Sequence, residues 1–500
     1  MNGSVDMNRR LFLKSSLAGA VAAGLPAGRL FADAPVAGAI EAVTGGGAPL
    51  SIEKAALEEL KASLRGALLL RGDPGYDQAR RVLNQSIDRY PALVVQPSGV
   101  ADIRTAVDFA RERELLLAVK CGGHSYSGRS TCDRGMQIDL SRFRGVRVDP
   151  VSRTAYVAGG SLLGELDHES MAFGLVTTSG TVSHTGVAGL TLGGGFGRLA
   201  RRHGLALDNL RAVELVTADG RHVRASETEN PELFWGVRGG GGNFGIATSF
   251  EFALHPMSRQ VVAGDLIFPM SRARELLEFY LDYSLRAPDD LYMDAIMFSP
   301  AGGRDGACLL SVCYTGPAEQ AETALGPVRK LGTPLKGALA SADYVAVQRS
   351  ADRTDPRNEG EYLKSGFIDG VAPTLVRTIM DGFIADPGRS TTVFFQHSGG
   401  AIGRIAADAT AFPHRRSTHN MFVAVRWPVA GDSSGHVAYL RKYWATLEPF
   451  TDGYYTNEVG DEAQRYVDEN YQGNLARLQA VKRKYDPGNL FQLNANVKPA

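Results

Sequence analysis

Short apolar segments alternate with segments of helical periodicity from residue 91 onward. Residues 91–97, PALVVQP, form a short apolar run that predicts a strand. Residues 98–114 place their apolar side chains on one helical face, and Ser98 stands where a helix N-cap is expected. Residues 115–121 are again apolar, so they predict a buried strand that leads directly into a glycine-rich loop.

The same alternation continues along the rest of the chain. Further strands and one hairpin are predicted at 136–140, 145–150, 154–160 and 212–225. The glycine-rich composition ends near residue 255. Residues 256–454 combine predicted strands with amphipathic helices, and this change predicts a second domain. Residues 464–486 have the periodicity of one helix, and Pro487 follows where that helix should stop.

The composition is that of a soluble globular protein, except for its glycine content. The 500 residues are 44% hydrophobic and 22% charged, and the formal net charge is zero. Equal numbers of acidic and basic residues argue against a nucleic-acid-binding surface. The 58 glycines cluster at 122–128, 180–204 and 236–245. Such clusters predict backbone with positive φ, or backbone that a ligand approaches closely.

The first 34 residues have the pattern of a twin-arginine (Tat) export signal. Arg9 and Arg10 precede a short apolar run, and Ala-Asp-Ala at 32–34 suits signal cleavage. The run is too short and too rich in glycine for a membrane anchor. We therefore expect the Tat export machinery as a partner, a periplasmic or extracellular location, no stable membrane span, and a linker at 35–50. Because the Tat route carries folded proteins, the signal also suggests a bound cofactor.

Two glycine runs imitate nucleotide-binding loops. Residues 240–245 have the spacing G-x-G-x-x-G, but alternating apolar residues at 246–254 predict a strand where a Rossmann loop needs a helix. Residues 195–200 have the spacing G-x-G-x-x-A and lead into a segment that can be helical, so an NAD-dependent Rossmann enzyme remains an alternative. Both runs can bind a diphosphate through backbone N–H groups.

The sequence has no recognisable metal-binding pattern, and it does not decide whether its cysteines form a disulfide. No Cys/His spacing suggests zinc, and no H-E-x-x-H is present. Cys121 and Cys132 can pair or remain buried free thiols, whereas Cys308 and Cys313 would point to opposite faces of one strand.

One histidine, His124, follows the predicted strand inside the sequence KCGGHSYSGRS. Ser127 stands where the G-x-S-x-G elbow of a serine hydrolase needs glycine, so serine hydrolysis is disfavoured. A lone histidine is more often structural than chemical. Here the flanking glycines would let a large group approach the imidazole ring.

Four ordered motifs carry a resemblance to a known family. They are the segment 91–128 with its GGHSYSG loop, the segment 186–210, the segment 233–252 and the C-terminal segment 454–499. Together they resemble the vanillyl-alcohol-oxidase class of flavoproteins, and in particular its berberine-bridge-enzyme-like branch. The resemblance extends from about residue 65 to 500.

The resemblance implies an α+β fold with two domains. An FAD-binding domain of the PCMH type would comprise residues 51–255, and residues 455–500 would complete it. A substrate domain at 256–454 would place an antiparallel sheet, covered by helices, over the flavin ring.

The resemblance also implies FAD linked covalently to His124 through the 8α-methyl group of the flavin. Val182 stands where many members carry a cysteine for a second bond, so we expect one covalent link. Thr185 aligns with the position that controls oxygen access, and its small size favours an oxidase. The residues expected to bind the cofactor are Gly122, Gly123, His124, Ser125, Gly128, Gly180, Thr185, Gly186, Gly189, Gly194, Gly195, Asp208, Asn209, Gly241, Asn243, Ile246, Asn457 and Asn494.

The family's Y-x-N motif appears as Tyr455-Thr456-Asn457. By resemblance Tyr455 lies over the flavin and acts in substrate deprotonation, with Tyr126 as the second catalytic candidate. Free tyrosine has a pKa near 10, so a base role needs a neighbour that lowers the pKa of Tyr455. The alternative is that Tyr455 only stacks or packs.

The implied reaction is hydride transfer from an alcohol or amine carbon to flavin N5, followed by reduction of O2 to H2O2. A dehydrogenase with another acceptor and a non-catalytic flavin- or carbohydrate-binding protein remain alternatives. The substrate is a small molecule; sugars, amine heterocycles, phenolic alcohols and polyketides all remain open.

Overall fold

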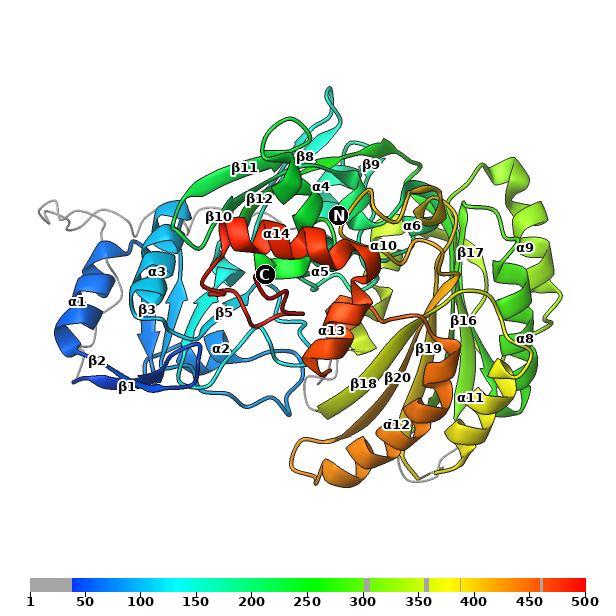
Figure 1. Cartoon of the computed structure of the whole chain (residues 1–500). Coiled ribbons are helices and arrows are strands. Elements are labelled where there is room, and N and C mark those ends of the chain that lie inside the picture. The colour runs from blue at the N-terminus through cyan, green and yellow to red at the C-terminus, as the bar shows by residue number, and fades with distance from the viewer. Residues whose placement is uncertain (1–37, 301–305, 355–358, 387, 459–461) are drawn as a thin grey trace, which may run out of the picture. The chain divides into compact units, whose positions relative to one another are not determined.

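The computed structural model describes residues 38–500 except 301–305, 355–358, 387 and 459–461 (Figure 1). Residues 38–500 form one compact unit. Among the helices of this described part, none is both long and apolar enough to cross a membrane. The expected Tat signal at 1–34 lies outside the described residues.

A four-stranded sheet begins the N-terminal half of the described chain. Its strands, in spatial order, are β3 (Ala67–Leu70), β4 (Leu93–Gln96), β6 (Met136–Asp139) and β5 (Leu117–Lys120). β4, β6 and β5 are parallel, and α3 (Val100–Glu112) connects β4 to β5 with its apolar face buried. The helix begins after Gly99, so the Ser98 N-cap prediction is wrong: the Ser98 hydroxyl instead donates to the Asp102 carboxylate.

A five-stranded antiparallel sheet follows. Its strands, in spatial order, are β11 (His222–Ser226), β10 (Leu210–Val216), β12 (Ile246–Ala253), β8 (Thr154–Ala158) and β7 (Val146–Asp149). Four helices belong to the same region: α4 (Leu163–Met171), α5 (Val187–Gly193), α6 (Ala200–His203) and α7 (Pro231–Val237). The glycine run at 239–242 leads through the short 3-10 helix η3 (Gly241–Asn243) into strand β12, which confirms the predicted strand where a Rossmann loop needs an α-helix.

A seven-stranded antiparallel sheet forms the other half. Its strands, in spatial order, are β17 (Ala340–Asp343), β14 (Gln260–Pro269), β16 (Ala307–Tyr314), β15 (Leu291–Ser299), β19 (Ser390–His397), β20 (His419–Pro428) and β18 (Glu359–Ile368). Figure 1 shows helices along one side of this sheet: α8 (Ala273–Ser284), α9 (Ala321–Arg329), α11 (Leu375–Ile384) and α12 (Ser434–Leu447). Apolar residues of these helices and of the sheet share one core.

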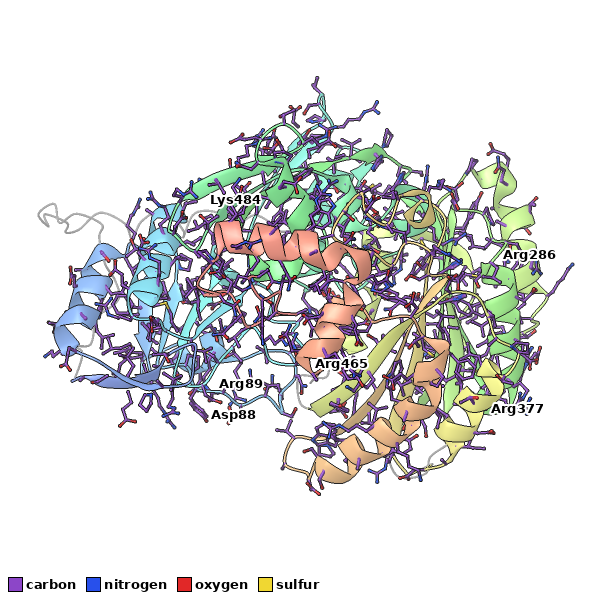
Figure 2. All side chains as sticks on the ribbon, viewed as in Figure 1. Asp88, Arg89, Arg286, Arg377, Arg465 and Lys484 are labelled. Carbon is purple, nitrogen blue, oxygen red and sulfur yellow. The ribbon has the colours of Figure 1, made fainter. Side chains whose placement is uncertain are left out.

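The other face of this sheet is less apolar and lies toward the four- and five-stranded sheets (Figure 1). Along β19, Val393, Phe395 and His397 are buried, while the alternating residues Phe394 and Gln396 are only half-buried. Figure 2 shows side chains such as Arg286 and Arg377, which are exposed, at the outer edge of the helical layer.

Three sequence predictions about boundaries differ from the structure. The expected linker at 35–50 contains β1 (Ile40–Val43), which pairs with β2 (Pro49–Ile52), so residues 40–50 are an ordered part of the compact unit. The domain boundary expected after residue 255 falls inside the short strand β13 (His255–Pro256). The single helix expected at 464–486 is broken, because Gln472 adopts a positive φ of 49°.

The break separates α13 (Gln464–Asn470) from α14 (Leu475–Tyr485).

All four cysteines are free thiols, so no disulfide contributes to the fold.

The C-terminal segment is tied to the glycine loop at 239–245 by a buried polar network. The Asn243 amide donates to the Ala495 carbonyl, and its oxygen accepts from the Val497 N–H. Lys482 on α14 donates to the Asn243 carbonyl at 2.8 Å and to the Asp486 carboxylate at 2.7 Å. Both charged side chains are fully buried. Burial lowers the pKa of Lys482, and Asp486 opposes that shift.

Candidate functional site

A cavity of about 350 Å³ lies where segments that are distant in sequence meet. Its walls come from the loop 121–130 after β5, from the segment 180–196 around α5, and from residues 241–247, 455–458 and 491–495. Gln396 of the seven-stranded sheet also lines it. Both halves of the molecule therefore contribute to one cavity.

Two glycines bring the first two walls into direct backbone contact. A Cβ on Gly122 would lie 2.3 Å from the backbone nitrogen of Gly186, and a Cβ on Gly186 would lie 2.4 Å from that of Gly122. No side chain fits between these segments. The loop that carries His124 is thus fixed against the start of α5.

Other glycines of the wall face open space. A Cβ on Gly189, Gly241 or Gly242 would have no heavy atom within 4 Å, although all three line the cavity. Three polar atoms of lining residues, Oδ1 of Asn494, Nη1 of Arg129 and Oγ of Ser130, are buried without a hydrogen-bond partner among the described residues. Open backbone walls and unused polar atoms fit a large, flat ligand that carries a diphosphate, as FAD does.

His124 contacts two polar neighbours at the start of the α5 segment. Its Nε2 lies 2.6 Å from Nδ1 of His184, and its Nδ1 lies 3.3 Å from the Thr185 hydroxyl. The two imidazole rings are tilted by 38°, with centroids 4.7 Å apart. One ring must donate and the other accept, so the tautomer of His124 depends on that of His184.

The phenol of Tyr455 is fixed by two donors. Its oxygen accepts from the Gly195 N–H at 2.8 Å and from the Asn457 amide at 2.7 Å. The ring is 5% exposed and packs edge-on against Phe196. Burial raises the pKa of Tyr455 well above its usual value, and the neighbouring charge of Glu458 raises it further. These surroundings keep Tyr455 a neutral phenol.

Glu458 is a buried carboxylic acid in the cavity wall, beside Tyr455. The Asn420 amide donates to both of its oxygens, at 3.3 and 3.1 Å. The same amide donates to Gln396 Oε1 at 2.9 Å. Burial raises the pKa of Glu458 to about 7.

Most of the residues predicted for the site line this cavity. They are Gly122, Gly123, His124, Ser125, Tyr126, Gly180, Thr185, Gly186, Gly189, Gly241, Ile246, Tyr455, Asn457 and Asn494. Six other predicted residues are not part of the lining: Gly128, Gly194, Gly195, Asp208, Asn209 and Asn243.

The six residues outside the lining support the walls instead. Asp208 forms a buried ion pair with Arg415 at 2.8 Å, and Asn209 donates to the carbonyls of His203 and Leu205. Gly194 and Gly195 pack against Tyr455 and Ala206, and Gly128 packs against Ile87. The Asn243 side chain forms hydrogen bonds with Ala495 and Val497 of the C-terminal segment. The side chains of Asp208 and Asn209, which were expected to bind the cofactor, are thus engaged in contacts within the protein.

The polar wall residues that sequence reasoning missed include Arg129, Gln396 and Glu458. Arg129 lies in the His124 loop, and Glu458 directly follows Asn457, so adjacency to a motif was the available signal. Gln396 lies on β19, far from any motif, and only the packing of the seven-stranded sheet brings it to the cavity.

Comparisons with known proteins agree with this architecture. A family model for the FAD binding domain matches residues 91–226, and one described as berberine and berberine like matches residues 454–498. The chain is 32% identical over 448 residues to an FAD-linked oxidoreductase of Dictyostelium discoideum, which covers 89% of this chain and 97% of the relative.

Two solved structures have a similar fold. The crystal structure of 6-hydroxy-D-nicotine oxidase from Arthrobacter nicotinovorans has a TM-score of 0.80 at 28% identity, and the match covers 88% of this chain and 99% of that one. Xylooligosaccharide oxidase from Myceliophthora thermophila, in complex with xylobiose, has a TM-score of 0.77 at 26% identity, with 89% and 99% covered.

Proposed function

Since the chain belongs to the berberine-bridge-enzyme-like family of FAD-linked oxidoreductases, we propose that it is an oxidase of alcohol or amine substrates. The substrate loses a C–H hydrogen together with its electron pair, and it loses a proton from the adjacent O–H or N–H group. Molecular oxygen receives the two electrons and two protons and becomes hydrogen peroxide. One observation supports the proposal most directly: His124, Tyr455 and Glu458 line the same cavity, and part of its wall is glycine backbone that faces open space.

The glycine-lined walls would hold FAD. Backbone of Gly122, Gly189 and Gly241 would lie against the cofactor, and Asn494 and Arg129 would supply polar contacts. When bound, FAD supplies the two-electron acceptor for the reaction. We place one covalent bond to FAD on His124, because His124 lines the cavity and no cysteine stands at position 182.

His124→Ala is expected to abolish covalent flavin retention. The wild-type protein should be yellow and should keep its flavin after acid denaturation and washing, because the imidazole is bonded to the cofactor. The variant should release all of its flavin into the supernatant. Visible absorbance of the washed pellet measures the difference.

The exposed His168 on α4 provides the control, since His168→Ala removes an imidazole outside the cavity lining. It should retain flavin as the wild type does. Flavin that washes out of the denatured wild-type protein would contradict the His124 bond.

Substrate oxidation in air is expected to release one hydrogen peroxide per product. The names of the relatives motivate two probes, 6-hydroxynicotine for amines and xylobiose for sugars. Without oxygen, an accepted probe should bleach the flavin once and then stop. Absorbance and peroxide assays on the purified protein give both readings.

The alternatives predict different results. A reduced flavin that persists in air, and that a quinone reoxidises, would identify a dehydrogenase. A flavin that stays oxidised with both probes and with a broader set of alcohols and amines would support a non-catalytic flavin-binding protein.

A further inference from the structure

The proton acceptor of the reaction can be sought among the cavity's side chains. Glu458 lies at the end of the 3-10 helix η9 (Thr456–Glu458), directly after the motif that carries Tyr455. It is the acidic residue among those that line the cavity. We propose that Glu458, and not Tyr455, is the catalytic base that takes the proton from the substrate's hydroxyl or amine group. This inference rests on the proposed function and names a residue for its proton-transfer step.

The surroundings of Glu458 leave its charge uncompensated. Its hydrogen-bond donors are the Asn420 amide on β20 and the Ser365 hydroxyl on β18, and both are neutral. Gln396 on β19 and the apolar helix α5 add no charge, and within the described part of the chain Tyr455 is the titratable group whose pKa Glu458 affects. Glu458 has no ion pair within the part of the chain that the structure describes. A carboxylate held this way gains from accepting a proton.

Tyr455 is poorly suited to the same task. Its phenol oxygen is the acceptor in both of its hydrogen bonds, which Gly195 N–H and Asn457 Nδ2 donate, and the ring is buried. As a neutral phenol it must first lose a proton before it can accept one. Glu458 needs no such step, because its pKa of about 7 leaves much of it ionised near neutral pH.

The proton and electrons balance in this scheme. The substrate's O–H or N–H bond breaks, and its proton moves to a carboxylate oxygen of Glu458. The electron pair of that bond becomes the second bond of the carbonyl or imine. The C–H hydrogen leaves with its electron pair to bound FAD, and O2 takes up the two electrons as proposed above.

The test is the anaerobic flavin-reduction rate of the holoenzyme, followed by stopped-flow absorbance. The substrate is whichever of 6-hydroxynicotine and xylobiose bleaches the flavin. Because the ionised form of Glu458 is active, the wild-type rate should rise with pH through about 7 and then level off. Glu458→Gln, which keeps the size of the side chain, should slow reduction by about 10²–10⁴-fold and remove this pH dependence.

Two further variants separate the base from its neighbours. Tyr455→Phe should keep the pH dependence, since the base is still present. Glu462→Gln removes a nearby acid that pairs with Lys364, and it should behave as wild type. A Glu458→Gln enzyme with the wild-type rate and pH profile would overturn the proposal, as would a Tyr455→Phe enzyme that alone loses the pH dependence.

A second measurement does not depend on turnover. Infrared difference spectra of the resting holoenzyme, wild type minus Glu458→Gln, should show a protonated carboxyl that ionises near pH 7. A carboxyl that is fully ionised at about pH 5, or fully protonated at about pH 9, would overturn the proposal even if neither probe reacts. If reduction is slow in Glu458→Gln but reduced wild-type enzyme does not react with oxygen, the oxidase assignment fails and the role of Glu458 stands.

Discussion

Lys482→Met is expected to lower the free energy of unfolding by about 3–5 kcal/mol, the usual cost of breaking a buried ion pair from one side. Lys482 and Asp486 are fully buried, and the variant leaves the Asp486 carboxylate without its cation. It also removes the donor to the Asn243 carbonyl, which ties α14 to the glycine loop. Equilibrium urea denaturation measures the loss as a lower midpoint.

Arg483→Met is the matched control, because it removes the same charge from the next residue of α14, where the side chain is exposed. We expect it to change the free energy of unfolding by no more than about 0.5 kcal/mol. The double variant Lys482→Met with Asp486→Asn should recover part of the loss, because no unpaired charge remains buried. Equal midpoints for Lys482→Met and Arg483→Met would show that the buried pair contributes nothing to stability.

Gly186→Ala is expected to destabilise the protein by about 1–3 kcal/mol and to deplete it of flavin. Its Cβ would lie 2.4 Å from the Gly122 nitrogen and 2.5 Å from the Cys121 sulfur, so the His124 loop must move away from α5. That movement separates the two walls that would hold the cofactor. Thermal denaturation and the ratio of flavin to protein absorbance measure the two effects.

Gly189→Ala tests the same wall without the clash. Its Cβ meets no atom within 4 Å and points into the open cavity, so the fold should keep its stability or gain about 0.5–1 kcal/mol from helix propensity. Flavin content should nevertheless fall if the cofactor occupies that space. Full flavin content and wild-type stability in Gly186→Ala would exclude the tight contact as a requirement of the site.

Local patterns predicted much of the fold because their signals lie within single segments. The alternation at 246–254 identified β12, and the apolar run at 115–121 identified the strand that delivers His124. Local patterns failed where a contact from elsewhere decides the outcome. The Ser98 N-cap prediction failed because the Ser98 hydroxyl donates to Asp102, a carboxylate that also accepts hydrogen bonds from the backbone of the distant Arg65 and Gly66.

In the candidate site, too, local sequence motifs identified some residues, while contacts between distant segments determine the others. The motif residues His124, Gly186 and Tyr455 were predicted from their sequence neighbourhood, and they line one cavity. The importance of Glu458 was not visible, because its hydrogen bonds come from Ser365 on β18 and Asn420 on β20, residues that lie 38 or more positions away along the chain. Side chains such as Asp208 follow a family motif, yet an ion pair with the distant Arg415 engages them within the protein.

The C-terminal network also has a consequence for how the protein is made. Residues 491–495 form part of the cavity wall, and Ala495 and Val497 hold Asn243 in the glycine loop. The cavity wall can therefore close only after residues 491–497 have been synthesised, about 250 positions after the glycine loop that they hold. Contacts that join residues about 250 positions apart form slowly, so closing this wall is a late step in the protein's maturation.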